Sequence, residues 1–200
     1  DHVKDKTIVL STTNGTFAVA AAQKAHKVVI ASFLNLDAVS EWLAVQNRRV
    51  TLICAGWKNK FNLEDSLLAG AIVDQLIHKM ENADLSDSAL AAQRLYNLGK
   101  NDLMESLEDS SHRRRLKKLF IEKDVEYCLT LNQTTSIPIL EAGNIIKLID
   151  ISRYELIRFF KRLSFKRLSY SKIRKIFDLK NYRYFPLYFA ALGLFIALLY

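Results

Sequence analysis

Cysteine is scarce in this chain, which has only Cys54 and Cys128 among its 200 residues. Two cysteines cannot form the dense disulfide framework of a small secreted domain, and their scarcity is typical of a reducing compartment, so we expect a cytoplasmic protein. We interpret both as small buried hydrophobic residues. The absence of a Cys-x-x-Cys pair argues against a zinc site.

The chain also lacks an initiating methionine and a recognisable signal peptide. It begins with Asp1 and stays polar to Lys6, and the apolar run that follows is too short for a signal sequence. We therefore expect a processed product or a fragment of a longer protein.

Acidic residues are almost absent from the last quarter of the chain. Residues 151–200 carry 11 of the 29 Lys and Arg residues but 2 of the 21 Asp and Glu residues, so they hold the whole basic excess behind the net charge of +8. We expect a nearly neutral domain over residues 1–149, a basic helical segment over 150–184 and an uncharged apolar segment over 185–200. As a helix the last segment would span about 24 Å, short of a ~30 Å bilayer core, so we interpret it as a truncated transmembrane helix.

The basic segment and the apolar run after it allow several interpretations. Basic residues beside an apolar run favour anionic lipid, which makes a catalytically inactive, membrane-tethered module the alternative to an enzyme. Membrane contact would then run through residues 150–200. Aromatic residues among the cations would also suit nucleic acid, but the basic stretch ends against an apolar run, so we predict no nucleic-acid partner. A gene fusion or frameshift is a further explanation of this tail.

Short apolar runs alternate with helical patterns in the first part of the chain. Apolar β-branched runs predict strands, and apolar residues at helical spacing predict the helices between them. Such alternation is typical of parallel βαβ units, so we predict an α/β fold with a mostly parallel or mixed sheet. The predicted elements are strand Thr7–Leu10, helix Gly15–Lys24, strand Val28–Ile30, helix Leu36–Gln46 and strand Val50–Cys54.

Helices dominate the middle of the chain. Asn62 and Ser86 are predicted N-caps, with Asp65 as the capping-box acid for the first helix and Gly99 as the end of the second. The remaining predicted elements are a partly basic helix over Ser110–Leu119 and two late strands, Ile137–Leu140 and Ile145–Ile149, around a turn over residues 141–144.

Small polar residues follow the first predicted strand. The backbone N–H groups and hydroxyls of Thr12, Thr13, Asn14 and Gly15 suit a phosphate at a helix N-terminus. The alternative is a capped tight turn, because Asn-Gly favours left-handed backbone and Thr caps helices. Both interpretations stay open. No Lys follows Gly15 as in a Walker loop, so nucleoside triphosphate binding is not indicated.

Three further side chains are candidates for chemistry. Glu64 and Asp65 are hard oxygen ligands at a helix start, although acidic residues there also compensate the helix dipole. His112 lies among three arginines, which suits an anion grip near a proton-transferring imidazole. A solvated basic helix face is the alternative for His112.

Seven short motifs occur in a fixed order between residues 7 and 149. They are Ser11–Thr16; Ser32–Asn35; Cys54–Gly56 with Phe61, Leu63–Asp65 and Ala69–Gly70; Asp87 with Ala89; Ser110, His112 and Leu116; Asp124 with Cys128; and Pro138, Leu140 and Gly143. This series resembles the 2-phosphosulfolactate phosphatase family, Mg²⁺-dependent enzymes of coenzyme M biosynthesis. The resemblance implies a three-layer α/β/α fold, incomplete at the N-terminus and followed by a helical C-terminal tail.

The resemblance also implies a reaction and a set of site residues. The expected reaction is hydrolysis of 2-phosphosulfolactate to 3-sulfolactate and phosphate, so the expected partner is a small anionic phosphate or sulfonate substrate. Glu64 and Asp65 are expected to bind Mg²⁺ and, with His112, to be catalytic. Whether water or an aspartate attacks phosphorus stays open. Whether the protein forms a homo-oligomer also stays open. The expected substrate-binding residues are Thr12, Thr13, Asn14, Gly15, Asn35 and Gly56.

The chain departs from the family pattern in several places. Family members begin well upstream with a half that this chain lacks, so we expect the chain alone to be inactive or nearly so. Phe17 stands where the family usually has a basic residue, and Arg113 interrupts a usual His-Gly-basic pattern. Residues 150–200 have no counterpart in the family.

Overall fold

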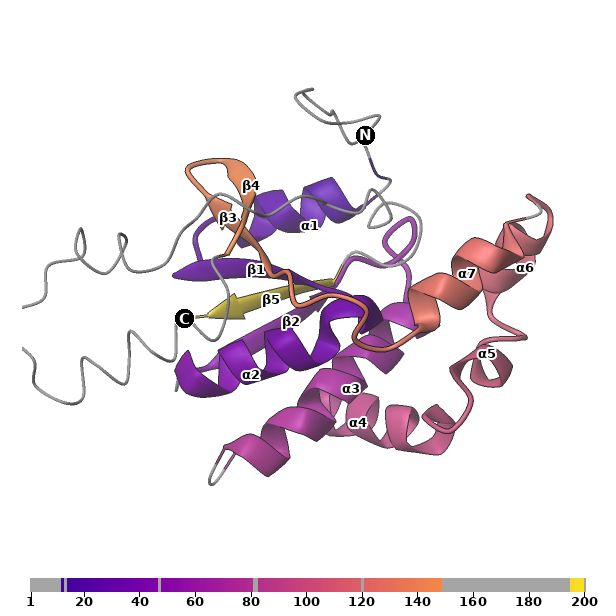
Figure 1. Cartoon of the computed structure of the whole chain (residues 1–200), viewed down its shortest axis with the longest axis horizontal. Coiled ribbons are helices and arrows are strands. Elements are labelled where there is room, and N and C mark those ends of the chain that lie inside the picture. The colour runs from indigo at the N-terminus through magenta and orange to yellow at the C-terminus, as the bar shows by residue number, and fades with distance from the viewer. Residues whose placement is uncertain are drawn as a thin grey trace, which may run out of the picture.

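The structure is a computed structural model that describes residues 12, 14–46, 48–80, 83–119, 121–148 and 195–199. It combines helices with one small sheet (Figure 1). The predicted strand Thr7–Leu10 and residues 150–194, which include most of the predicted tail, lie outside the described residues.

The helices largely follow the sequence pattern. The predicted helix Leu36–Gln46 is confirmed with the same bounds, and the helices predicted after Asn62 and Ser86 both form. The described helices are α1 (Gly15–Ala22), the short 3₁₀ helix η1 (Phe33–Asn35), α2 (Leu36–Gln46), α3 (Leu63–Lys79), α4 (Asp87–Gly99), α5 (Leu103–Ser106), α6 (Ser111–Lys117) and α7 (Glu122–Leu129).

Side-chain caps fix where three of these helices begin. The side chains of Asn62, Ser86 and Ser110 accept N–H bonds from the third residue of α3, α4 and α6, respectively. Each bond satisfies a backbone donor that has no partner within its helix. The capping-box role expected for Asp65 is wrong, because its carboxylate accepts instead from the N–H of Gly56.

The five described strands form a sheet in the order β2-β5-β1-β3-β4. All its adjacent pairs are antiparallel, so the predicted parallel pairing is wrong for the described strands. The direct cause is β5, which pairs with both β1 and β2 and keeps these two strands from bonding to each other (Figure 1). The strands are β1 (Lys27–Ala31), β2 (Val50–Cys54), β3 (Pro138–Glu141), β4 (Asn144–Lys147) and β5 (Phe195–Leu199).

The helix expected at the end of the chain is wrong for residues 195–199, which form β5. The interpretation of residues 185–200 as a truncated transmembrane helix fails for the same residues, which pair with β1 and β2. A central strand position offers hydrogen-bond partners on both sides, which satisfy the backbone of an apolar segment as a helix would. In the described part of the chain, no helix combines the length and apolar character needed to cross a bilayer.

The predicted late strands form a tight hairpin. β3 and β4 pair from Pro138↔Lys147 to Glu141↔Asn144. The two residues between them, Ala142 and Gly143, have φ of 48° and 80°, the left-handed backbone that two-residue hairpin turns require.

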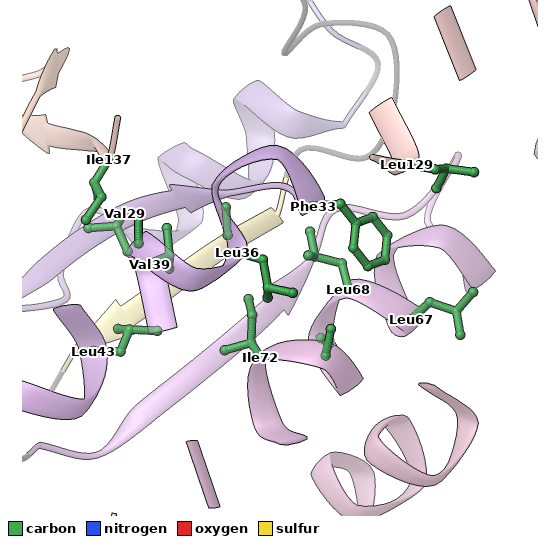
Figure 2. Close-up of a cluster of buried hydrophobic side chains, with 14 of the residues drawn as sticks. Val29, Phe33, Leu36, Val39, Leu43, Leu67, Leu68, Ile72, Leu129 and Ile137 are labelled. Carbon is green, nitrogen blue, oxygen red and sulfur yellow. The ribbon is translucent and has the colours of Figure 1, made fainter. Parts of the chain in front are cut away.

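The two faces of β1 contact different helices. Val28 packs with Ala18 and Ala22 of α1. Val29, the next residue, belongs to the larger cluster with α2 and α3, because successive strand residues point to opposite faces. Figure 2 shows this larger cluster, which also contains Ile137 and Leu129.

Helix α4 packs closely on α3. A Cβ on Gly70 would lie 2.0 Å from the carbonyl oxygen of Ala92, so only glycine permits this approach. Asp74 of α3 also accepts hydrogen bonds from Gln93 and Asn97 of α4, at 2.8 and 3.0 Å. These contacts hold α4 along α3 and so steady the helix whose first turn carries Glu64 and Asp65.

Candidate functional site

The loop between β2 and α3 is held in a tight conformation. Gly56 has φ of 72°, and a Cβ there would lie 2.6 Å from the carbonyl oxygen of Lys60, so glycine is required. The N–H of Gly56 donates to Oδ2 of Asp65 over 2.7 Å. Asn14 Nδ2 donates to the carbonyl of Ala55 over 3.1 Å, which joins the start of α1 to the same loop.

Asp65 is the most buried acidic residue of this region, with 1% of its surface exposed. Burial raises the pKa of its carboxyl to about 6; the Gly56 N–H opposes this shift and the nearby Glu64 adds to it. Oδ1 of Asp65 is buried and has no hydrogen-bond partner in the described part of the chain. One oxygen of this carboxylate is therefore committed to the loop and the other is available.

Glu64 contacts the start of α6. Its Oε1 accepts a 2.6 Å hydrogen bond from the Ser110 hydroxyl and lies 3.8 Å from Nδ1 of His112. Ser110 in turn caps α6 by accepting the N–H of Arg113 over 3.0 Å. The capping residue of one helix thus positions the first-turn carboxylate of another.

The imidazole of His112 is half-buried at this junction. Burial holds its pKa below the usual range and Arg115 lowers it further, while Glu64 acts in the opposite direction. A histidine with a lowered pKa is neutral at pH 7, so its approach to Glu64 is not an ion pair at that pH. Nδ1 of His112 is buried, and none of the residues that the structure describes forms a hydrogen bond with it.

Trp57 joins the loop to α6. Its ring stacks on that of His112 with centroids 6.4 Å apart and an interplanar angle of 17°. The guanidinium carbon of Arg115 lies 4.6 Å from the centroid of the Trp57 ring, within cation–π range. Two carboxylates from α3 and an imidazole and an arginine from α6 therefore meet around one loop.

The comparison with known proteins gives a family for this chain. The family model described as 2-phosphosulpholactate phosphatase matches residues 1–143. The chain belongs to this family. Glu64, Asp65 and His112 lie within the matched range, as do Trp57 and Arg115.

Curated relatives agree with this assignment. Proteins named probable 2-phosphosulfolactate phosphatase from Thermotoga petrophila and Thermotoga maritima are 42% and 41% identical over 143 residues. A protein of the same name from Caldanaerobacter subterraneus is 34% identical over the same length. In all three matches 72% of this chain is covered, and the chain spans about 60% of each relative's length.

The residues expected to bind phosphate lie at the start of α1. Thr12 accepts the N–H of Thr16 over 2.9 Å through its hydroxyl, which is the capping contact of the alternative interpretation. Gly15 is the buried first residue of α1, and Asn14 contacts Ala55 as described above. Thr13 lies outside the described residues. Asn14 thus lies beside Gly56, in the loop that binds Asp65, since its Nδ2 is 3.9 Å from a Cβ built on Gly56.

Asn35 does not have the free amide that substrate contact would require. It is fully buried, and its Nδ2 donates to the carbonyls of Ile30 and Ser136 at 3.2 and 3.0 Å. Its Oδ1 accepts from the N–H of Ser32 over 2.8 Å. In this structure Asn35 joins the end of β1 to the segment before β3, a structural role where a substrate contact was expected.

Cys54 differs from its expected burial, whereas Cys128 is buried as expected. Cys54 is exposed because it ends β2, the outermost strand on that side of the sheet.

Glu64 and Asp65 fit part of a Mg²⁺ coordination sphere. Mg²⁺ commonly takes one or two carboxylates and fills its other positions with water and substrate phosphate. The available Oδ1 of Asp65 is suited to this role. Among the described residues, no group of three or more His, Cys, Asp and Glu side chains forms a metal site by itself.

Sequence reasoning did not assign Ser110, Trp57 or Arg115 to the site. The Ser110-x-His112 spacing offered a signal for Ser110, because a cap must lie beside the first turn of its helix. The sequence pointed to Arg115 only as one of the three arginines beside His112. It offered no signal for Trp57, whose contact with Arg115 joins a loop to a helix far along the chain.

Proposed function

We propose that this chain carries the catalytic carboxylates of a phosphatase that hydrolyses 2-phosphosulfolactate to 3-sulfolactate and phosphate. The observation that supports it most directly is the junction of α3 and α6, where Glu64 is bound by Ser110 and approached by His112. The names of the relatives support the substrate. The reaction would belong to coenzyme M biosynthesis in the cytoplasm, on a domain completed as a three-layer α/β/α fold.

In this proposal Glu64 and Asp65 hold a Mg²⁺ ion against the phosphate group. Mg²⁺ bound there would polarise the phosphoryl oxygens and offset their charge. Both carboxylates are buried, so little water would compete with them for the cation. Gly56 orients the Asp65 carboxylate and Ser110 orients that of Glu64.

His112 would act on protons at the same junction. Its lowered pKa keeps the imidazole neutral at pH 7, so one ring nitrogen can accept a proton and the other can donate a hydrogen bond. Its stack on Trp57 fixes the plane of the ring. The start of α1, with Asn14 and Gly15 beside the loop, would supply N–H donors to the phosphate.

The decisive experiment measures phosphate release from 2-phosphosulfolactate. Because the chain spans about 60% of its relatives' length, the assay uses the chain joined to the portion of the Thermotoga maritima relative that it does not cover. Turnover should require Mg²⁺ and disappear with chelator. Glu64→Gln keeps the shape of the side chain but removes its charge, and it should lower turnover by about 10²-fold or more.

The matched control is Glu105→Gln. Glu105 is also in the first turn of its helix, so it shares the dipole contribution of Glu64 but is exposed. Turnover of this variant should stay within about two-fold of the unsubstituted protein. Equal turnover of Glu64→Gln and Glu105→Gln, or activity that survives chelation, would exclude the proposed metal site.

A further inference from the structure

The loop that carries Trp57 is a rigid small hairpin. Trp57 and Lys60 exchange backbone hydrogen bonds of 3.2 and 3.0 Å. Lys58 and Asn59 between them have φ of 49° and 58°, the left-handed backbone of a two-residue turn. Together with the glycine required at position 56, this geometry fixes the direction in which the indole projects.

Basic groups gather around that indole. Arg115 lies over the ring at 4.6 Å, and Nζ of the exposed Lys58 lies 5.8 Å from the ring centroid. His112 stacks on the same ring. Arg115 is half-buried against the ring, whereas Lys58 is exposed.

The three arginines of α6 differ in their partners. Arg113 lies 3.9 Å from Glu122, and the exposed Arg114 donates to the backbone carbonyl of Asp109. Nη1 of Arg115 makes a long contact of 3.4 Å to the Ser111 hydroxyl. Among the described residues its buried Nη2 has no hydrogen-bond partner, although a buried guanidinium nitrogen normally has one. The arrangement thus leaves a positioned donor unused.

We propose that Arg115, held over Trp57, binds the sulfonate group of the substrate and so selects sulfonated over unsulfonated phosphate esters. This inference rests on the proposed function, because the substrate named for the relatives carries both a phosphate and a sulfonate. In this arrangement the phosphate lies at the Glu64 and Asp65 carboxylates. The sulfonate lies on the opposite side of His112, at Arg115.

The chemistry of the two groups favours this assignment. A sulfonate carries one permanent charge spread over three oxygens, and it binds hard cations weakly. Guanidinium is likewise planar, delocalised and weakly hydrated, and it remains charged when half-buried. The phosphate has the higher charge and is the group suited to Mg²⁺. His112 lies between the two sets, 3.8 Å from Glu64 on one side and stacked on Trp57 on the other.

Binding to the 200-residue chain tests the inference without requiring turnover. The probes are 3-sulfolactate, lactate and inorganic phosphate, each titrated calorimetrically. Tryptophan fluorescence, measured with Trp42 replaced by Phe so that Trp57 is the remaining indole, gives a second signal. The chain should bind 3-sulfolactate more tightly than lactate. Arg115→Gln should weaken 3-sulfolactate binding by about 10- to 100-fold and change phosphate binding less than two-fold, as expected for loss of one charge-assisted contact. Arg115→Lys, which keeps the charge but not the fork, should recover part of the affinity.

Arg114→Gln is the matched control and should leave all three affinities within two-fold. Circular dichroism of each variant checks that the fold is retained. Equal affinity of the chain for 3-sulfolactate and lactate, or an equal loss of phosphate and 3-sulfolactate binding in Arg115→Gln, would overturn the inference. The same variant in the joined protein should lower kcat/KM for 2-phosphosulfolactate but not for 2-phospholactate. Arg115-dependent binding of 3-sulfolactate without any turnover would uphold the inference and count against the proposed function alone.

Discussion

The Ser110 hydroxyl donates to Glu64 across 46 positions of sequence, over a distance of 2.6 Å. The same oxygen accepts the N–H of Arg113 and so caps α6. One hydroxyl group therefore holds the starts of α3 and α6 together.

Removing this hydroxyl should destabilise the protein. Ser110→Ala loses both a helix cap and a buried hydrogen bond to a carboxylate, so the free energy of unfolding should fall by about 1–3 kcal/mol. Urea denaturation followed by circular dichroism measures this change. Ser111→Ala, at the exposed neighbouring position, should alter stability by less than about 0.5 kcal/mol. Equal stabilities of the two variants would contradict the double role of Ser110.

The buried Asp65 should make stability depend on pH. Its carboxyl pKa rises from 3.8 to about 6 on folding, so the folded state binds more protons between these values. The contribution of protonated Asp65 is therefore complete below pH ~4 and is lost as the pH rises through 6. Relative to Asp65→Asn, the unsubstituted chain should lose on the order of 2 kcal/mol between pH 4 and 7. Urea denaturation in the presence of chelator tests this, and parallel pH profiles for the two proteins would disprove it.

Glycine substitutions should separate close packing from backbone strain. In Gly70→Ala the new Cβ meets the Ala92 carbonyl at 2.0 Å, so α3 and α4 must move apart. We expect a loss of about 2–3 kcal/mol or more. In Gly143→Ala the new Cβ meets no described atom within 4 Å, so the loss comes from the φ of 80° alone. We expect the free energy of unfolding to fall by about 1 kcal/mol. Thermal unfolding of both variants gives the comparison; a smaller effect at Gly70 would show that the helices adjust freely.

Magnesium should stabilise the folded chain through Glu64 and Asp65. A ligand that binds only the folded state raises the unfolding temperature as its concentration increases. Thermal shift measurements at neutral pH should show this for the unsubstituted chain and for Glu105→Gln, but not for Glu64→Gln. An identical shift in all three proteins would place the cation elsewhere.

Sequence reasoning succeeded where the causes are local. The caps at Asn62 and Ser86 could be predicted because a cap and the N–H it accepts are three residues apart. The β3–β4 hairpin could be predicted because Ala142-Gly143 closes it within two residues.

The remaining features depend on contacts between distant segments. Asp65 looked like a capping-box acid, yet the loop at Gly56 takes its carboxylate. Asn35 lies in a recognisable motif, but motif membership does not reveal that Ile30 and Ser136 occupy its amide. The contact between Trp57 and Arg115 joins a loop to a helix, and no local sequence pattern connects the two.

The central position of β5 has a consequence for the order of folding. Val28 pairs with Leu198, and Thr51 pairs with that same residue from the other side. During synthesis β1 and β2 leave the ribosome long before this partner exists. The pairing of β1 and β2 with β5 can therefore form only after residues 195–199 have been made. Contacts of such long sequence separation slow folding and prolong the exposure of unpaired strand edges, so a chaperone would have most to protect in this interval.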